Sequence, residues 1–583
     1  MTRVCRLDLL PRLYLPLILM LVVAFAWRPL GGHDDFWAHA AIGRWIWQHQ
    51  SAPQHTLYLW SVNPPIPWIA HSWLTQVTFY VFMAVGGERF GPYLANAFTA
   101  LIAALTFTWV WSLWTQRARV TSLMVLVFAL AVTVSAPRFR PRPELFTAFF
   151  LCCLLAFLLS RAARHEAAGR AEEDRAEDRP LQALGIVMLF VLWANFHGAV
   201  AIGLMILTAT VVGDLLQDDV CGGRFPSPAW RLVLLLALCA AAVFANPYGA
   251  AYWQALKPVT SKMFAEIDEW KPFWKHPALG YEFVAGELLL VYIALLSWLG
   301  NPQRRWAHLA WLLLMSAAFL SARRHLWLLA LVSLAVMAYN AHALDTAQLW
   351  RAWSKLRDRR ARRKVEPPAR SIYDDPYREP PVPPALDGAD QKPDEIAPMP
   401  DLWRDAVRAG IALFLFIGVL RGIPHDVLPL RAVSRYLPTG AVRSMDEHKL
   451  QGRMFNDYEN SSYLLWHFAG RRPLYIDLLN AYPDQLLMDY FDVIWANPRG
   501  RKLMDKWDIR YVFLRRHKET EGISRLKHYL NKSPQWQRVY GEADGSVWRR
   551  VTRAATPAKR TPASSAPATK RGSNPASRAP AAR

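Results

Sequence analysis

Two adjacent carboxylates, Asp34 and Asp35, follow an apolar amino-terminal run in the stretch GGHDDFWAHAAIGRWIW at residues 31–47. A carboxylate in this position can deprotonate an acceptor hydroxyl or bind a divalent cation. In a helix that begins at the pair, Asp35 and His39 lie one turn apart on one face. Helix capping by Asp34 and a favourable dipole interaction of Asp35 also explain the two carboxylates. Both interpretations fit the sequence.

Arginines form a second group of candidate residues, in PRFRPRPE at 137–144 and SARRH at 321–325. The guanidinium group binds phosphate oxygens in a bidentate manner, so a cluster predicts a site for a phosphate-bearing lipid headgroup. Contact with the headgroups of ordinary phospholipid is the simpler alternative. The candidate phosphate-binding residues are Arg138, Arg140, Arg142, Arg323 and Arg324.

Further polar residues stand at the ends of apolar runs. The histidines have no His-x-x-x-His spacing and there is no Cys-x-x-Cys unit, so a zinc site is not indicated, although a divalent cation stays open as a cofactor. Asn195 and His197 can equally well form hydrogen bonds between helices. The candidate site-lining residues are His39, His71, Glu144, Asn195, His197 and Glu269.

The elements that must position these groups are apolar runs between residues 13 and 340. Hydrophobic residues make up 53% of the chain and charged residues 20%, which suits a membrane region joined to polar segments. Together with the amino-terminal anchor, the runs predict about eleven membrane-spanning helices. The runs are 92–114, 120–135, 145–160, 181–194, 199–212, 232–245, 288–299, 307–320, 326–339 and 407–420.

The segment at residues 72–85 decides the sidedness of everything after it. As a helix it would be about 21 Å long, which is short of the membrane hydrocarbon, so we expect an interfacial helix rather than a span. Alternation of the other spans then places the basic segments at 115–119, 161–170 and 356–364 in the cytoplasm, as the positive-inside rule requires. All the candidate site residues fall on the opposite side.

This topology predicts a polytopic α-helical membrane protein with a small C-terminal α/β extramembrane domain. In that domain YLLWHF, RPLYIDL and RYVFLRR predict strands, whereas DQLLMDYFDVIW and RGRKLMDKW predict helices. The expected parts are a membrane domain at 1–345 with its first periplasmic loop at 28–90, a basic, Pro-rich cytoplasmic linker at 346–402, a last transmembrane helix at 403–422, a periplasmic α/β domain at 423–552 and a disordered tail at 553–583.

The formal net charge of +22 does not indicate a nucleic-acid partner. No zinc-finger spacing, RNA-binding signature or helix-turn-helix pattern accompanies the charge, which lies largely in the linker and the tail. The Gly-rich loop of nucleotide-binding proteins is also missing from the sequence.

The order of the motifs resembles the GT-C superfamily of glycosyltransferases, which use polyprenyl-phosphate-linked sugars, and within it a group of uncharacterised bacterial membrane proteins. The segments that carry the resemblance are DDFWAHAAIGRWIWQH, PWIAHSWL, RPRPELF, LWANFHG, ANPYG, ARRH and FNDYENSSYLLW. The resemblance implies that Asp35 or Asp34 is the catalytic aspartate and that the arginines contact the lipid phosphate. The sequence departs from the Pro-Pro-Leu pattern of many members, with Ala-His-Ser-Trp at 70–73.

The expected function is transfer of a sugar from a polyprenyl-(di)phosphate donor to a periplasmic acceptor hydroxyl of a cell-envelope glycan, lipid or protein. The protein would lie in the bacterial inner membrane with a cytoplasmic amino terminus. A transporter or flippase of a lipid-linked glycan is one alternative, which predicts ionisable groups deep inside spans and paired repeats. A non-catalytic membrane scaffold that presents the C-terminal domain is the other.

Overall fold

The structure is a computed structural model that describes residues 10–171, 180–221, 229–256, 268–275, 280–344, 401–422 and 431–551. The expected linker at 346–402 lies outside these residues except for its last two positions, and the expected tail at 553–583 lies outside them completely.

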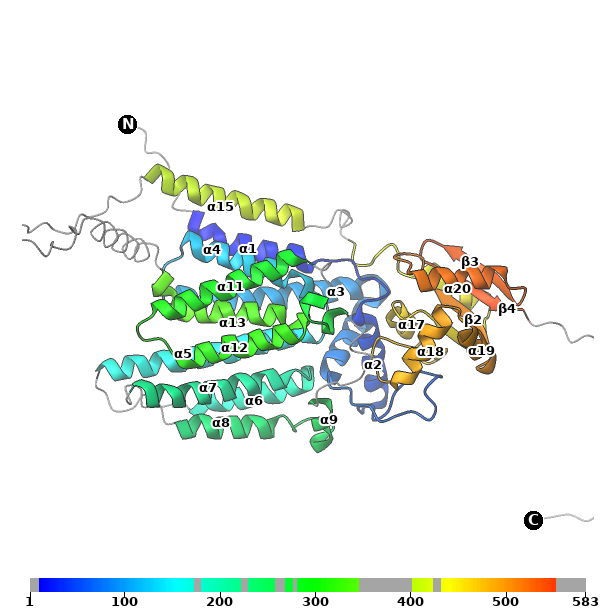
Figure 1. Ribbon diagram of the computed structural model, residues 1–583, viewed down its shortest axis with the longest axis horizontal. Coiled ribbons are helices and arrows are strands. Elements are labelled where there is room, and N and C mark those ends of the chain that lie inside the picture. Colours follow the sequence, from blue (N-terminus) through cyan, green and yellow to red (C-terminus); the bar gives the residue numbers. More distant parts are fainter. Residues whose placement is uncertain are drawn as a thin grey trace, which may run out of the picture.

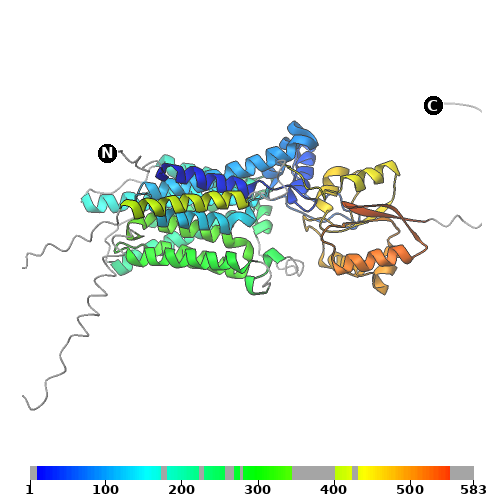
Figure 2. The ribbon, with the colours of Figure 1, turned by 90° about the horizontal axis from the view of Figure 1, so that it is seen from above.

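Long apolar helices lie side by side in one bundle (Figure 1), and α15 lies against α1 (Figure 2). At the centre is α13, in which every residue is buried. The bundle helices are α1 (Leu10–Ala26), α3 (Trp73–Thr115), α4 (Ser122–Ser135), α5 (Glu144–Ala171), α6 (Pro180–Phe196), α7 (Val200–Cys221), α8 (Ala229–Ala242), α11 (Tyr281–Gly300), α12 (Trp306–Ser321), α13 (Leu326–Tyr339) and α15 (Asp401–Gly422).

The outer surface of the bundle is apolar. On α11, Leu288, Tyr292 and Leu296 recur every four residues and are each about half exposed. Such apolar stripes are stable in lipid and would be unstable in water, so they assign the bundle to a membrane. Among the described helices, α3, α5, α7 and α11 contain segments long and apolar enough to cross it, and the other apolar helices are shorter. The number of spans therefore stays a prediction.

The segment expected to be interfacial forms the first part of α3. Gly87 interrupts this helix with a φ of 61° and a ψ of −167°, a conformation that glycine adopts without strain. Before the kink, α3 packs on α2 (Asp35–His49), and a Cβ on Gly43 would lie only 1.9 Å from the Gln76 carbonyl oxygen. Glycine at position 43 thus permits the close approach of the two helices.

The C-terminal unit is α/β, as expected. Its sheet has the order β1-β2-β4-β3, with β1 (Arg453–Asn456) parallel to β2 (Ile509–Leu514). The strands β3 (Trp536–Glu542) and β4 (Gly545–Arg550) pair antiparallel, and β4 also pairs antiparallel with β2. Its helices are α16 (Thr439–Glu447), α17 (Ser461–Phe468), α18 (Asp484–Ile494), α19 (Pro498–Lys506) and α20 (Glu521–Lys532).

Two of the three strand predictions in this unit are wrong. YLLWHF forms most of the helix α17, whose residues are nearly all buried. A short, continuous apolar run is compatible with a buried helix as well as a buried strand. Its periodicity therefore does not distinguish between the two. RPLYIDL contributes only an isolated bridge between Leu474 and Leu59. RYVFLRR supplies most of β2, and the two helix predictions correspond to α18 and α19.

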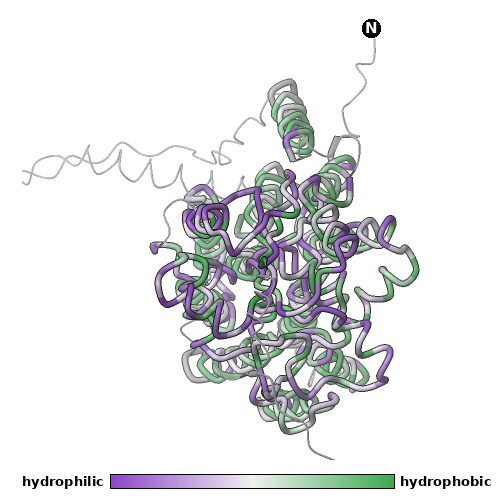
Figure 3. The backbone as a smooth tube through the Cα atoms, turned by 90° about the vertical axis from the view of Figure 1, so that its right-hand side faces the viewer, coloured by the Kyte–Doolittle hydropathy of each residue, from purple (hydrophilic) through white to green (hydrophobic). Residues whose placement is uncertain are grey.

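The first loop, between α1 and α3, joins the bundle to the C-terminal unit (Figure 1). Phe36 of α2, Phe79 of α3 and Tyr463 of α17 belong to one hydrophobic core, and Leu30 pairs with Val433 in a parallel bridge. Seen from this end, hydrophilic segments lie among the hydrophobic helices (Figure 3). The remaining short helices are η1 (Ala136–Arg138), η2 (Gly249–Tyr252), α9 (Trp253–Leu256), η3 (Asp268–Trp270), η4 (Phe273–Lys275), η5 (Arg323–His325) and η6 (Ala341–Leu344).

Candidate active site

Asp34 is a buried carboxylate with both oxygens in use. Its Oδ2 accepts a hydrogen bond from the Gly31 N–H at 2.6 Å, and its Oδ1 lies 3.5 Å from the Arg140 guanidinium. Asp34 occupies the N-cap position of α2, but its side chain accepts no capping hydrogen bond from the helix. The carboxylate therefore stabilises the loop before the helix, and side-chain capping does not explain this residue.

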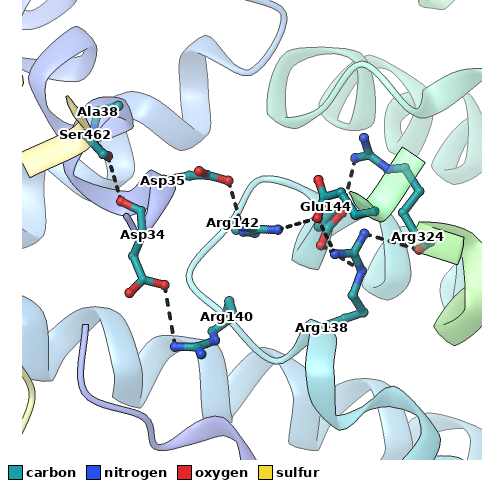
Figure 4. Close-up of polar contacts among 10 residues, drawn as sticks. Asp34, Asp35, Ala38, Arg138, Arg140, Arg142, Glu144, Arg324 and Ser462 are labelled. Atoms are coloured by element: carbon teal, nitrogen blue, oxygen red, sulfur yellow. Dashed lines mark hydrogen bonds and ion pairs between the residues drawn. The ribbon is translucent and has the colours of Figure 1, made fainter. Parts of the chain in front are cut away.

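Asp35 points the other way, toward Arg142 (Figure 4). Its Oδ2 lies 3.0 Å from Arg142 Nε, and its side chain is 29% exposed. Within the described residues, no hydrogen bond or ion pair uses its Oδ1. Burial raises the pKa of Asp35 to about 6 against the opposing effect of Arg142, and Glu269, Asp34 and Glu144 raise it further. Asp35 thus combines a raised pKa with an oxygen that can meet a ligand.

Carboxylates and arginines alternate through the site. Glu269 Oε2 lies 3.0 Å from Arg142 and 2.8 Å from Arg138. Arg138 Nε in turn lies 3.3 Å from Glu144 Oε1. The other oxygen of Glu144 lies 3.3 Å from Arg324, so one network joins the loops before α2, α5 and α13 (Figure 4). The structure therefore brings together segments that are far apart in the sequence.

Opposite charges determine the protonation of the network. Burial alone raises the pKa of Glu269, but Arg142 and Arg138 outweigh this effect and hold the pKa below its ordinary value. Burial alone lowers the pKa of Arg142, but Asp35 and Glu269 raise it above its ordinary value. These groups are charged at neutral pH, and the arginines are partly neutralised before any ligand binds.

The arginines line a cavity of about 420 Å³ between the loops and the bundle, which we name the headgroup cavity after the ligand that is proposed for it below. Its apolar residues Phe283, Val284 and Leu326 lie at the starts of α11 and α13. All five predicted phosphate-binding arginines line it, together with Asp34 and Glu269. Arg324 also lies over the Trp270 ring at 4.2 Å, a contact that orients its guanidinium.

A second cavity of about 720 Å³ is lined by residues of the C-terminal unit and of the loops at the bundle. We name it the acceptor cavity after the ligand that is proposed for it below. Asp35 and Arg142 line one side of it. Tyr458 and Asn480 of the C-terminal unit also line it, and the Tyr458 hydroxyl donates to Asn480 Oδ1 at 2.8 Å. Asp35 therefore faces the C-terminal unit, whereas Asp34 faces the headgroup cavity. His33 lines both cavities and connects them.

The predicted histidines gather beside this network and are neutral. Burial, with a smaller contribution from neighbouring positive charge, lowers the pKa of His39 to about 3 and that of His71 to about 4. Burial also lowers the pKa of His197 well below its ordinary value. His39 is held by Gln76 at 3.3 Å, so the histidines act here as uncharged polar groups.

Asn195 and His197 serve the packing of the helices. Asn195 accepts a hydrogen bond from Trp73 Nε1 at 2.7 Å and donates to the Ala245 carbonyl at 2.9 Å. His197 Nδ1 lies 2.7 Å from the Thr147 hydroxyl. The hydrogen-bonding alternative from the sequence therefore accounts for both residues, and neither lines the two cavities described above.

The described carboxylates and histidines do not match a metal site. No group of three or more His, Cys, Asp or Glu side chains within the described ranges is placed to hold an ion. Asp34, Asp35, Glu144 and Glu269 each face an arginine, which would repel a cation. The described residues therefore do not fit a divalent cation, and the reaction proposed below uses none.

The sequence predicted that the C-terminal domain covers the site or selects the acceptor, but it did not identify the residues that do so. The Ser462 hydroxyl donates to the Asp34 carbonyl at 2.7 Å and accepts from the Ala38 N–H at 2.9 Å, which fixes the start of α2 (Figure 4). Both Ser462 and Tyr458 belong to the segment FNDYENSSYLLW. That segment carries part of the family resemblance. The resemblance was the sequence signal that could have identified Ser462 and Tyr458 as site residues.

No family model matches the chain, and no curated protein matches it. Among solved structures, the chain is similar to the archaeal oligosaccharyltransferase AglB from Archaeoglobus fulgidus in complex with an inhibitory peptide and a dolichol-phosphate. The identity is 13%, with 87% of this chain and 69% of that chain covered and a TM-score of 0.49. It is also similar to ArnT from Cupriavidus metallidurans in the apo state, with 14% identity, 91% and 96% coverage and a TM-score of 0.48. At these values neither structure assigns an activity to the chain.

Proposed function

We propose that this chain is a membrane glycosyltransferase of the GT-C type that transfers a sugar from a polyprenyl phosphate or diphosphate to an acceptor hydroxyl. The observation that carries the proposal is Asp35, which lines the acceptor cavity beside an arginine-lined headgroup cavity and has one oxygen outside its ion pair with Arg142. A base with a pKa of about 6 is ionised at neutral pH and can still take a proton in the transition state.

The headgroup cavity supports a lipid-linked phosphate as the donor. Its lining combines the apolar residues Phe283, Val284 and Leu326 of bundle helices with five arginines. An isoprenoid chain would lie along the bundle while its phosphate meets the guanidinium groups. Arg140 is the best placed to turn toward it, because the 3.5 Å contact with Asp34 is its one ion pair among the described residues.

In the proposed reaction, the acceptor hydroxyl gives its proton to Asp35 while its oxygen forms a bond to the anomeric carbon of the sugar. The bond between that carbon and the phosphate oxygen breaks, and the phosphate leaves with the electron pair. The negative charge that develops on the leaving group is stabilised by Arg140, Arg323 and Arg324. The acceptor would be a cell-envelope glycan, lipid or protein held under the C-terminal unit.

The proposed orientation places the site on the periplasmic face of a bacterial inner membrane, with the amino terminus in the cytoplasm. Arg117 and Arg164 support this orientation, because they lie near Tyr339 at the opposite end of the bundle from the site. Positive residues favour the cytoplasmic side of spans. A reporter fused after Arg550 should therefore be active only in the periplasm, and a cytoplasmic signal would contradict the orientation.

One observation favours the transporter alternative. Glu287 of α11 is fully buried inside the bundle, and neither of its oxygens has a hydrogen-bond partner in the described structure. An ionisable group inside a membrane helix is a functional candidate by default. Glu287 nevertheless lies one turn beyond Phe283 and Val284, so it also fits a position beneath the floor of the headgroup cavity.

The deciding experiment measures sugar transfer from radiolabelled polyprenyl-phosphate sugars by the full chain in nanodiscs. Asp35→Asn should lower turnover by about 10²–10⁴-fold, the usual contribution of a general base, while binding of the polyprenyl phosphate is retained. Asp34→Asn is the comparison variant, because both oxygens of Asp34 are already engaged by Gly31 and Arg140, so its turnover should stay well above that of Asp35→Asn. Equal turnover in the wild type and Asp35→Asn would overturn the assignment of the base.

A further inference from the structure

A third cavity, of about 770 Å³, lies between the first loop and the C-terminal unit, and we name it the interdomain cavity. Beside this cavity, the segment after α1 pairs with the segment before α16. The Leu30 N–H donates to the Ala432 carbonyl at 2.8 Å, and the Ser434 N–H donates to the Leu30 carbonyl at 2.9 Å. Its positively charged or titratable nitrogen groups come from four parts of the chain: His33, Arg140, Arg431, Arg435, Arg515, His517 and Lys518.

The positive charge of this cavity is not balanced by its carboxylates. Asp544 is engaged by the N–H groups of Gly440 and Ala441 at the start of α16 and by the Tyr540 hydroxyl. Glu459 lies 3.4 Å from Arg515. Within the described residues, Arg431, Arg435 and Lys518 have no ion pair, so the cavity carries an excess of positive charge.

Aromatic contacts hold part of this charge in place. Tyr436 stacks on His517 with a centroid distance of 3.8 Å and an interplanar angle of 7°. The Arg435 guanidinium lies over the Tyr436 ring at 4.8 Å. Partial burial and then the charges of Lys518 and Arg435 lower the pKa of His517, which is the response expected in a positive field. The aromatic contacts therefore orient these groups at the cavity, although the side chains of Arg435, His517 and Lys518 are exposed.

The interdomain cavity adjoins the proposed site of transfer. Glu459 and Arg515 line it together with the acceptor cavity, and Arg140 lines it together with the headgroup cavity. A ligand with a hydroxyl near Asp35 could thus extend past Glu459 and Arg515 into the positive region.

We propose that the interdomain cavity binds an anionic group, a phosphate or a carboxylate, that is carried by the acceptor. The positive charge without paired carboxylates selects an anion, and the shared wall with the acceptor cavity assigns that anion to the acceptor. The part of the proposal that concerns the acceptor depends on the proposed function, whereas anion binding itself does not.

The test uses the full chain in nanodiscs of phosphatidylcholine, which has no net charge. The probes are radiolabelled inorganic phosphate and a short-chain phosphatidic acid, which distinguish a free anion from a lipid-borne one. The variant is Arg435→Gln with Lys518→Gln, and the matched control is Lys502→Gln with Lys506→Gln, two exposed cations of α19 outside the cavity. Binding of polyprenyl phosphate in the same samples reports on the donor site and on folding.

We expect at least a tenfold weaker binding of phosphate or phosphatidic acid in the Arg435/Lys518 variant, with polyprenyl-phosphate binding unchanged and the control variant like the wild type. Restoration of binding by Arg435→Lys with Lys518→Arg would support the charge-based mechanism. Equal anion binding in the variant and the control would overturn the proposal. A loss that occurs equally in both would indicate nonspecific attraction and overturn it as well. Absence of polyprenyl-phosphate binding in the wild type would contradict the proposed function alone.

Discussion

Asp35 Oδ2 and Arg142 Nε lie 3.0 Å apart, and this contact joins the start of α2 to the loop that precedes α5. Arg142 also contacts Glu269 at 3.0 Å, so the proposed base is positioned by a residue that is itself held from the opposite side. One oxygen of Asp35 is thereby oriented, and the residue lines the acceptor cavity.

The pKa of Asp35 predicts an acid limb in the pH dependence of turnover. Because its folded-state pKa is raised to about 6, the base is ionised above this pH and becomes protonated below it. Turnover should fall about tenfold per pH unit below pH 6, the limiting slope of a single ionisation. The same shift makes the contribution of Asp35 to folding stability larger below its unfolded-state pKa and smaller as the pH rises through about 6.

The measurement is the rate of sugar transfer between pH 4.5 and 8, a range we set at about 1.5–2 units around that pKa. Arg142, Glu269, Asp34 and Glu144 are the charged groups that act on Asp35. Arg142 and Glu269 should retain their charge over this range, because the pKa of Arg142 is raised and that of Glu269 is lowered. A profile that is flat through pH 6 would be incompatible with Asp35 as the base.

Ser462→Ala should loosen the contact between the C-terminal unit and α2. The substitution leaves the buried Asp34 carbonyl without the Ser462 donor and the Ala38 N–H without an acceptor. The expected cost is about 1–3 kcal/mol in the free energy of unfolding. Hydrogen exchange at residues 34–38 should increase, whereas the exposed Ser524→Ala serves as the control. Unchanged exchange in Ser462→Ala would show that the hydroxyl does not hold the helix.

Gly43→Ala should displace α2 from α3. The added methyl would lie 1.9 Å from the Gln76 carbonyl oxygen, so the helices must separate, and Asp35 would move with α2. Overpacking of this kind costs about 1–3 kcal/mol, and turnover should fall as well. Gly185→Ala is the matched control, because a Cβ at this helical glycine meets no atom within 4 Å. Thermal unfolding and sugar transfer of the two variants check this prediction, and equal behaviour would refute it.

Glu287→Leu tests whether the Glu287 carboxyl has a role in function or only lowers the stability of the fold. Both oxygens of Glu287 are buried without a hydrogen-bond partner in the described structure, so an apolar residue of similar size should raise the free energy of unfolding by about 1–3 kcal/mol. For a glycosyltransferase with the site proposed above, turnover should persist. A stabilised protein that loses turnover would assign a role in the reaction to Glu287. Loss of lipid-linked glycan translocation would instead favour the transporter.

Much of the architecture follows from local properties of the sequence. The apolar runs predict the bundle helices because a helix in lipid must satisfy its own backbone and be apolar along its length. The alternation of spans predicted that the acidic pair and the arginines share one end of the bundle, and the ion pairs among Asp35, Arg142 and Glu269 place them there. The apolar patterns of the sequence likewise predicted the helices α18 and α19 and the strand β2.

The tertiary structure alone decided how these residues divide their roles. Asp34 and Asp35 are adjacent and chemically identical. Only in the folded loop does Asp34 contact Gly31 and Arg140, whereas Asp35 contacts Arg142. The sequence alone determined that carboxylates and arginines meet at one end of a membrane bundle. It could not determine which oxygen stays available or that Ser462 and Tyr458 complete the site, because such contacts depend on long-range packing that no local pattern encodes.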